Sequence, residues 1–155
     1  MPISVGDQAP LFTLNNTNNE PVSLEAYRGQ PVVVLFFPLA FTGVCTAEMC
    51  TMRDNMAQYN GVNAQVFGIS VDSPFTLAQF KQKENLNFPL LSDFNKEAAT
   101  AYDVLYTEFF GMRGVAKRSA FVIDADGRVA YAEVLEDAGE QPNYLAMQST
   151  LRQLA

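Results

Sequence analysis

The feature that most constrains the fold is an uninterrupted apolar run, PVVVLFF, at residues 31–37. A strand with one solvated face alternates in polarity, so a continuous run of β-branched and aromatic residues indicates a strand buried on both faces. A second such run, QVFGISVD, follows at residues 65–72. The segment between the two runs has helical spacing, and the order strand, helix, strand predicts a parallel βαβ unit at the centre of a sheet.

The helix of this unit is predicted to extend from about Gly43 to Tyr59, with Gly61 as its stop signal. The apolar residues at helical spacing are Met49, Met52, Met56 and Tyr59. Methionines on one helical face are more typical of core packing than of a set of metal ligands.

The remaining segments complete an α/β sandwich. LFTLNNTNNEPVSL predicts a hairpin, because alternating apolar residues flank an Asn-rich turn. Ser73 and Pro74 are typical of an N-cap and first-turn proline, and they precede the predicted helix FTLAQFKQKEN. NFPLLSD indicates a short strand or extended loop, NKEAATAYDV a short helix, and SAFVIDADGRVAYAEV a hairpin around an Asp-Gly turn.

The closing stretch, PNYLAMQSTLRQL, is predicted to be a helix that packs on the sheet. Its apolar face comprises Tyr144, Met147, Leu151 and Leu154. No internal repeat or linker divides the sequence, so we expect residues 1–155 to form a single domain.

Charge and hydropathy exclude two classes of partner. The chain has a net charge of −7 and no run of Lys or Arg, so phosphate backbones and anionic membrane surfaces are repelled. The start, MPISVGDQAP, lacks the pattern of a signal peptide, and the apolar segment PVVVLFFPLAF falls short of the roughly 20 residues of a membrane span. We expect a cytoplasmic protein that binds neither nucleic acid nor membrane.

Both cysteines lie in one stretch, PLAFTGVCTAEMC, and the chain contains no histidine. Two cysteines without histidine cannot complete a usual zinc shell, so no metal site is expected. Cys45 falls in the first turn of the predicted helix, where unpaired backbone N–H groups and the helix dipole favour a negative charge. Thr42 is the expected N-cap and Pro38 ends the strand. We expect the Thr42 hydroxyl and the amides near Val44 and Cys45 to point into one small space beside the sulfur.

Further stabilisation of a Cys45 thiolate has to come from arginine or lysine, because a free cysteine is mostly protonated at neutral pH. Arg118 is the best candidate, since it opens the strand RSAFVID, whose start can reach the helix N-terminus. Arg113 and Lys117 are weaker candidates from the same region. Glu48, one helical turn after Cys45, either holds Arg118 or is a solvated acid of the first turn.

The segment PLAFTGVC matches the P-x-x-x-T-x-x-C signature of peroxiredoxins, and GDQAPLFTL, FPLLSD and RSAFVID extend the resemblance over nearly the whole chain. The resemblance implies a thioredoxin-like fold with a central mixed sheet flanked by helices, and thiol peroxidase activity without a cofactor. It implies that Cys45 is the peroxidatic cysteine, that Pro38 and Thr42 complete the signature, and that Arg118 binds thiolate and peroxide.

Two subfamilies contribute to the resemblance. FFPLAFTGVC looks most like the alkyl hydroperoxidase E type, whereas a cysteine five residues later is typical of the peroxiredoxin Q (bacterioferritin comigratory protein) type. The family implies hydrogen peroxide, organic hydroperoxides and peroxynitrite as substrates, thioredoxin or a glutaredoxin-like donor as reductant, and a homodimer. The aromatic residues Phe37, Phe41, Phe109 and Phe110 are either core or an apolar rim of the substrate site.

Cys50 has two interpretations. As a resolving cysteine it would condense with a Cys45 sulfenic acid to form an intrachain disulfide. Five residues along an ideal helix separate the Cα atoms by roughly 8 to 9 Å, whereas a disulfide needs about 7 Å or less. The helix would then have to unwind, and we hypothesise that Gly43 eases this step. Alternatively, Cys50 is a small buried hydrophobic residue.

Two other functions remain as alternatives. A thioredoxin-type disulfide oxidoreductase is disfavoured, because that chemistry uses C-x-x-C and the spacing here is C-x-x-x-x-C. A non-catalytic binding module or redox sensor would keep the fold and pass oxidation to a partner.

Overall fold

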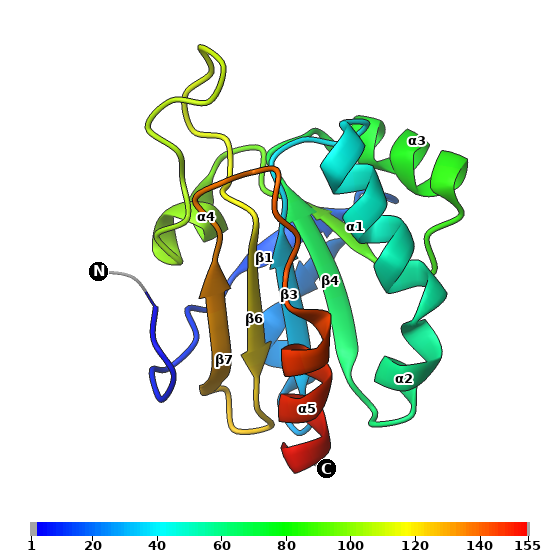
Figure 1. The fold of residues 1–155 in the computed structure, drawn as a ribbon, viewed down its shortest axis with the longest axis vertical. Helices are drawn as coiled ribbons and strands as arrows, with labels where there is room; N and C mark the ends of the chain where they lie inside the picture. Colours follow the sequence, from blue (N-terminus) through cyan, green and yellow to red (C-terminus); the bar gives the residue numbers. More distant parts are fainter. Residues whose placement is uncertain (1–2, 155) are drawn as a thin grey trace.

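The computed structural model describes residues 3–154, which form a seven-stranded mixed sheet with helices against both faces (Figure 1). Hydrogen-bonded neighbours follow the order β2-β1-β5-β4-β3-β6-β7. The strands are β1 (Thr13–Asn16), β2 (Pro21–Ser23), β3 (Val32–Phe36), β4 (Gln65–Ser70), β5 (Leu90–Ser92), β6 (Ser119–Ile123) and β7 (Val129–Val134). The helices are η1 (Leu24–Tyr27), α1 (Gly43–Asp54), α2 (Met56–Asn60), α3 (Pro74–Glu84), α4 (Glu97–Ala101) and α5 (Tyr144–Leu154). The predicted fold class, an α/β fold with a central mixed sheet, is confirmed.

The centre of the sheet is the predicted βαβ unit. β3 and β4 pair in parallel, with Val34 opposite Phe67, and β5 continues the parallel arrangement beyond β4. β6 lies on the other side of β3 and runs antiparallel to it. All five residues of β3 are buried, as its uninterrupted apolar sequence predicts.

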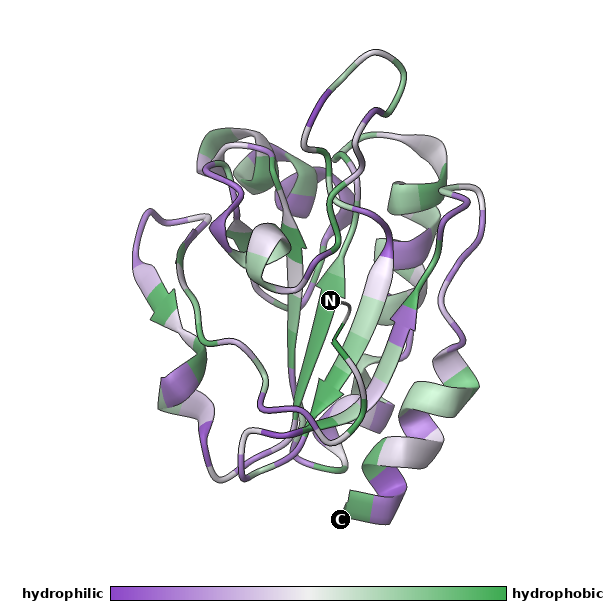
Figure 2. Cartoon of the chain, turned by 90° about the vertical axis from the view of Figure 1, so that its left-hand side faces the viewer, coloured by the Kyte–Doolittle hydropathy of each residue, from purple (hydrophilic) through white to green (hydrophobic). Residues whose placement is uncertain are grey.

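Successive residues of β3 point to opposite faces of the sheet and build two separate cores. Val33 and Leu35 face the core that α1, α2, α3 and α5 cover, whereas Val34 and Phe36 face the core beneath α4, η1 and the N-terminal segment. Figure 2 shows the central strands as the most hydrophobic part of the chain. The helix that carries both cysteines, α1, is therefore fixed against one face of the sheet.

The packing of α1 against the sheet depends on its methionines and on a glycine below them. Met49 and Met52 are fully buried, which confirms their predicted role in the core. A Cβ at Gly68 of β4 would lie 2.8 Å from Leu90 Cδ2 and 3.2 Å from Met49 Sδ. Glycine at this position therefore allows the helix to approach the strand closely.

Two local predictions are wrong. The helix expected to continue to Tyr59 is interrupted at Asn55, whose side-chain Nδ2 donates to the Thr51 carbonyl at 2.8 Å. Because Asn side chains that bond to nearby backbone compete with helical geometry, α1 ends there and α2 starts as a separate short helix. At the C-terminus, Met147 and Leu151 are buried as predicted, but Leu154 is 39% exposed because α5 extends past the sheet.

The segment between α4 and β6 forms a hairpin that the sequence pattern did not predict. Isolated bridges pair Leu105 with Ala116 and Phe109 with Met112. Phe110 (φ +49°) and Gly111 (φ +81°) form its tip, and positive φ at both central residues is typical of a tight hairpin turn. We call residues 105–116 the aromatic hairpin; in Figure 1 it is the yellow-green loop that projects above the sheet.

No helix among residues 3–154 is long and apolar enough to span a membrane.

Candidate active site

The connection from β3 to α1 carries the predicted site residues. The Phe37 N–H still donates to the Ile69 carbonyl at 2.9 Å, so the chain leaves the sheet at Pro38. α1 begins at Gly43, which places Cys45 in its first turn as predicted. Backbone N–H groups at this end of a helix lack intrahelical acceptors, and together with the helix dipole they favour a negative charge on the sulfur.

Thr42 occupies the N-cap position of α1, but its side chain does not cap the helix. Its backbone is extended (φ −89°, ψ 156°), as an N-cap requires, yet Oγ1 donates to the Leu39 carbonyl at 2.8 Å. Thr42 is therefore the N-cap residue by position, as predicted, without a capping hydrogen bond from its side chain. The hydroxyl closes the turn before α1 instead, and the helix begins without a side-chain cap.

Arg118 reaches the same place along the neighbouring strand. Ser119, the first residue of β6, pairs with Phe36, the last residue of β3. Because the two strands are antiparallel, the residue before β6 lies beside the point where the chain leaves β3 for α1. The register of one strand pair thus brings together segments that lie far apart in sequence.

The guanidinium of Arg118 connects three groups of the site. Nη2 lies 3.2 Å from Cys45 Sγ and donates to the Ala138 carbonyl at 3.0 Å, while Nη1 donates to Glu48 Oε1 at 2.6 Å. The Arg118 residue is only 1% exposed, and a cation so deeply buried requires such partners. Arg118 is therefore a buried cation and not part of an ordinary surface ion pair.

Glu48 is fully buried against Arg118, so the alternative that it is a solvated acid is wrong. Burial raises the pKa of Glu48 to about 7, because desolvation outweighs the opposing charge and hydrogen bond of Arg118. Glu48 Oε2 has no hydrogen-bond partner within the described part of the chain. An acid with a raised pKa therefore lies directly beside the cation that contacts the cysteine.

Cys45 and Arg118 line an open pocket of about 580 Å³. One wall comes from the connection between β3 and α1, a second from the aromatic hairpin, and a third from residues 136–139 after β7. The pocket is far larger than hydrogen peroxide requires, and its volume is typical of small-molecule sites.

Five of the predicted site residues line this pocket, and Phe41, Glu48 and Cys50 do not. Pro38, Thr42 and Val44 line it together with Cys45 and Arg118. Phe41 does not line it; its ring packs against Phe80 of α3, with centroids 5.2 Å apart. Phe41 has a left-handed backbone conformation (φ +68°), and its side chain lies against α3 and not in the pocket.

The aromatic hairpin and the loop after β7 contribute residues that the sequence reasoning missed or left open. Phe109 and Phe110 belong to the pocket wall rather than to the core, and Tyr106 stacks on Phe109 with centroids 5.0 Å apart. The Ala138 carbonyl and the acidic side chain of Glu108 were not anticipated. The only sequence signal was the local density of aromatic residues, because neither segment has helical or strand periodicity.

Of the weaker cation candidates, Lys117 forms an ion pair with Glu136 at 2.9 Å, and Arg113 is exposed on the aromatic hairpin. Neither lines the pocket. The structure therefore brings only Arg118, of the three candidates, into contact with the Cys45 sulfur.

Cys50 lies further along α1 and is half-buried outside both cores. Its thiol donates to Glu84 Oε1 of α3 at 3.5 Å, and burial is the main reason that the pKa of Cys50 is raised. These features do not fit a small residue that simply fills the core. Both cysteines are free thiols in this structure.

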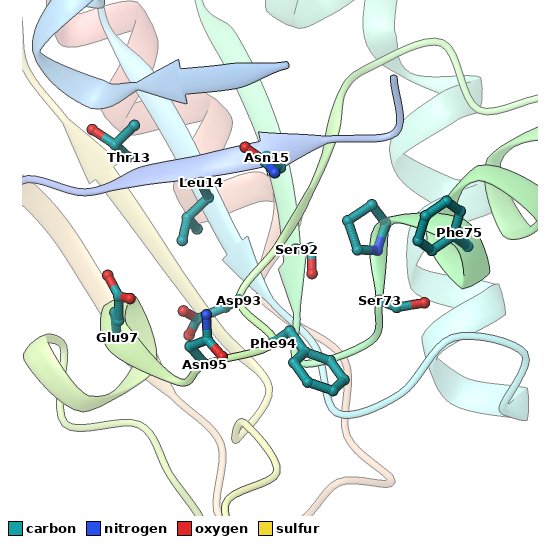
Figure 3. A pocket seen from close by; sticks show the side chains of 11 residues that line it. Thr13, Leu14, Asn15, Ser73, Phe75, Ser92, Asp93, Phe94, Asn95 and Glu97 are labelled. Carbon is teal, nitrogen blue, oxygen red and sulfur yellow. The ribbon is translucent and has the colours of Figure 1, made fainter. Parts of the chain in front are cut away.

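A second hollow, of about 420 Å³, lies beside β1 and the end of β5. Its lining side chains come from β1, from the segment after β5 and from the start of α3 (Figure 3). Its buried carboxylate, Asp93, is already occupied, because it accepts from the N–H groups of Ala98 and Ala99 at the start of α4. No cysteine lines this hollow, whereas Cys45 lines the larger pocket described above.

Within residues 3–154, no group of three or more His, Cys, Asp or Glu side chains is arranged to hold a metal ion. The chemistry available at the pocket is therefore that of a cysteine sulfur beside a buried arginine, open to a small molecule.

Comparisons with known proteins agree with this arrangement. The AhpC/TSA family matches residues 5–132 of the chain. Peroxiredoxin Bcp of Escherichia coli is 39% identical over 133 residues, which cover 84% of this chain and 85% of that protein. Alkyl hydroperoxide reductase E of Mycobacterium bovis is 38% identical over 133 residues, covering 85% and 86%. The crystal structure of peroxidoxin BcpB from Mycobacterium tuberculosis superimposes with a TM-score of 0.88 at 30% identity, covering 99% of both chains.

The expected resemblance to both the peroxiredoxin Q and the alkyl hydroperoxidase E types is thus confirmed, since relatives of each kind have almost equal identity. The chain belongs to the AhpC/TSA family of peroxiredoxins and is a thiol-dependent peroxidase with a thioredoxin-like fold.

Proposed function

We propose that Cys45 is the peroxidatic cysteine and that it reduces hydrogen peroxide, organic hydroperoxides and peroxynitrite. The observation that carries the proposal is the 3.2 Å contact between Arg118 Nη2 and Cys45 Sγ at the bottom of an open pocket. A guanidinium at this distance stabilises a thiolate and can donate to a peroxide bound against it. Pro38, Thr42 and Val44 line the same pocket and shape the space around the sulfur.

The reaction at Cys45 is a two-electron displacement. The thiolate attacks the terminal oxygen of R–O–OH, the S–O bond forms as the O–O bond breaks, and Cys45 becomes a sulfenic acid. The leaving alkoxide takes a proton from solvent and departs as an alcohol, or as water when R is hydrogen. Arg118 stabilises the charge that develops on the leaving oxygen.

Cys50 is the proposed resolving cysteine. Its thiol condenses with the Cys45 sulfenic acid, which forms a disulfide and releases water. Both residues belong to α1, where ideal geometry separates the Cα atoms by roughly 8 to 9 Å, beyond the limit of about 7 Å for a disulfide. Part of α1 must therefore unwind before the bond can form.

The contacts of α1 indicate which half unwinds. Its C-terminal half is held to α3 and the following loop, because Cys50 contacts Glu84 Oε1, Arg53 Nη1 donates to the Glu84 carbonyl at 2.5 Å, and Asn87 Nδ2 donates to the Arg53 carbonyl at 3.2 Å. The N-terminal end lacks a side-chain cap. We therefore assign the movement to Cys45, which leaves the pocket, while Cys50 stays in place.

The catalytic cycle closes when a dithiol reductant of the thioredoxin or glutaredoxin-like class reduces the disulfide and regenerates both thiols. The family resemblance supports this class of reductant and a homodimer. The continuous sheet supports one domain over residues 1–155, and the two free thiols suit the reducing conditions of the cytoplasm.

The proposal is tested by mixing the reduced protein with one equivalent of hydrogen peroxide and measuring intact mass and free thiols within seconds. A loss of about 2 Da with both thiols consumed, and no crosslinked dimer on a non-reducing gel, indicates an intrachain disulfide. A gain of about 16 Da with Cys50 still free would overturn its role as resolving cysteine. Cys45→Ser is expected to abolish peroxide consumption, whereas Cys50→Ser is expected to stop at the sulfenic acid and to overoxidise with excess peroxide.

A further inference from the structure

The pocket wall contributed by the aromatic hairpin is apolar. Tyr106, Phe109 and Met112 line the pocket, and Phe110 at the tip is 88% exposed yet also lines it. Burial of an organic group against this wall is favourable in proportion to the apolar area removed from water. Hydrogen peroxide cannot use such a wall, so it provides binding energy only to larger hydroperoxides.

The rim of the same pocket is acidic. Glu108 of the hairpin and both Glu136 and Asp137 of the loop after β7 line it. Lys117 neutralises Glu136 in an ion pair at 2.9 Å, but within residues 3–154 neither Glu108 nor Asp137 forms an ion pair. Asp137 Oδ1 accepts the backbone N–H of Gly139 at 2.8 Å.

The single cation inside the pocket does not offset these charges. Arg118 is already in contact with the Glu48 carboxyl group and the Cys45 sulfur. The chain as a whole carries a net charge of −7, so the field outside the pocket is also negative. Arg113 is exposed on the aromatic hairpin but does not line the pocket, so within residues 3–154 a ligand that brings a second negative charge to the rim meets no unpaired cation among the lining residues.

We infer that this pocket selects uncharged hydroperoxides with an apolar organic group and discriminates against hydroperoxides that carry a carboxylate. The inference rests on the proposed function, because it concerns the substrate class of the Cys45 site. The aromatic hairpin supplies the attraction to the apolar group, and Glu108 and Asp137 supply the repulsion of the carboxylate. Specificity of this kind combines an attractive contact with a repulsive one.

The test compares cumene hydroperoxide with its para-carboxylate, which has the same ring and the same reacting group. Oxidation of reduced Cys45 is followed by rapid quench and intact mass, because the chain has no tryptophan to report it by fluorescence. We expect the uncharged compound to react about tenfold faster at about 0.02 M salt, and the ratio to fall to about threefold at about 0.5 M salt, because salt screens exposed charges.

The double variant Glu108→Gln/Asp137→Asn removes both uncompensated charges and keeps side-chain size, and the Asn amide oxygen can still accept from Gly139. We expect it to lower the ratio between the two compounds at low salt by about fivefold. The matched control, Glu20→Gln/Glu25→Gln, removes the same charge at the far edge of the sheet, where both side chains are exposed. It is expected to leave the ratio unchanged.

Equal rates for the two cumene compounds at low salt, or a ratio that the rim variant does not change, would overturn the inference. It would also be overturned if hydrogen peroxide oxidised Cys45 while cumene hydroperoxide did not, although the proposed peroxidase function would then survive for the smaller substrate. If none of the three peroxides oxidised Cys45, the proposed function would be rejected and this inference with it.

Discussion

Arg118 and Cys45 are 73 residues apart in sequence, yet Nη2 of the arginine lies 3.2 Å from Sγ of the cysteine. The antiparallel register between β3 and β6 creates this proximity, and burial of the arginine makes the interaction strong because little water screens it. The same guanidinium contacts the carboxyl group of Glu48. We therefore expect the reactivity of the Cys45 thiol to depend on both Arg118 and Glu48.

Loss of the arginine is expected to slow the chemistry strongly. Arg118→Met should lower the second-order rate constant for Cys45 oxidation by about 100-fold, because a preorganised donor to the leaving oxygen is lost. Arg118→Lys keeps the charge, but a lysine cannot contact Cys45 and Glu48 with two separate nitrogens as the guanidinium does. Its Cys45 should react about tenfold more slowly than that of the parent. Stopped reactions quenched by alkylation measure both rates. Arg113→Met, which removes an exposed cation outside the pocket, serves as control and should react like the parent protein.

The same substitution is expected to destabilise the fold, since it leaves Glu48 buried without its cation, at a cost of about 3 to 5 kcal/mol. The double variant Glu48→Gln/Arg118→Met removes the unpaired charge as well and should recover part of the melting temperature. If its Cys45 remained slow while the fold was restored, the loss of rate would be due to the arginine and not to unfolding. A double variant as reactive as the parent would contradict the role of Arg118.

The pKa of Glu48, about 7 in the fold against an ordinary value of 4.5, predicts a pH dependence of stability. Between these two values the folded protein holds more protons than the unfolded chain, so the free energy of unfolding falls as pH rises. Glu48→Gln keeps a hydrogen-bond acceptor for Arg118 and cannot ionise. Thermal melts should be recorded between pH 5 and pH 8, a range of about three units around this pKa. The melting temperature of the parent should fall as pH rises, and that of Glu48→Gln should fall less.

The same variant separates the electrostatic role of Glu48 from a purely structural one. An ionised Glu48 competes with the sulfur for the charge of Arg118, so iodoacetamide should alkylate Cys45 faster in Glu48→Gln than in the parent at about pH 8, where Glu48 of the parent is ionised. Identical alkylation rates for the two proteins would show that Glu48 only fills space beside Arg118.

Disulfide formation is expected to depend on how readily the start of α1 unwinds. A Cβ at Gly43 would meet nothing within 4 Å, so Gly43→Ala acts through helix propensity and favours the folded helix by up to about 1 kcal/mol. Ala47→Gly, at an exposed position of the same helix, lowers helix propensity and therefore destabilises α1. The rate of disulfide formation after oxidation should fall in the first variant and rise in the second; unchanged rates in both would exclude unwinding as the controlling step.

Glu84 is expected to restrain Cys50. Its Oε1 accepts from the Cys50 thiol at 3.5 Å, which holds the sulfur toward α3 and away from Cys45. Glu84→Gln weakens this acceptor, keeps the side-chain length and leaves the backbone contact with Arg53 in place. Rapid-quench mass spectrometry should show faster disulfide formation, by about twofold to fivefold for one weakened hydrogen bond. Glu20→Gln is the control, and a slower reaction in Glu84→Gln would indicate that the carboxylate instead assists the thiol.

The tip of the aromatic hairpin is expected to affect large substrates selectively. Phe110→Asn removes the ring and tolerates the left-handed backbone at this position. It should lower the rate with cumene hydroperoxide about fivefold more than the rate with hydrogen peroxide, since only the larger substrate contacts the ring. The control is Phe75→Asn, at another exposed aromatic residue that does not line the pocket. Equal losses with both peroxides in Phe110→Asn would contradict the contact.

The sequence by itself determined the strands and helices that a hydrophobic pattern within one stretch of chain can predict. The apolar runs at residues 31–37 and 65–72 could be read as buried strands, because a strand covered on both faces excludes polar side chains along its whole length. The helical spacing of Met49 and Met52 likewise indicated the face of α1 that packs on the sheet. The position of Cys45 after a strand and in the first turn of a helix followed from the same patterns.

Only the tertiary structure decided what surrounds the sulfur. The 3.2 Å contact with Arg118 depends on the register between β3 and β6, and the aromatic hairpin has no periodic pattern from which its position could be inferred. The contact of Cys50 with Glu84 depends on how two helices pack, and Phe41 turned away from the pocket although it lies within the signature segment. Local patterns determine which residues form strands and helices, whereas distances between side chains remote in sequence arise only when those elements pack together.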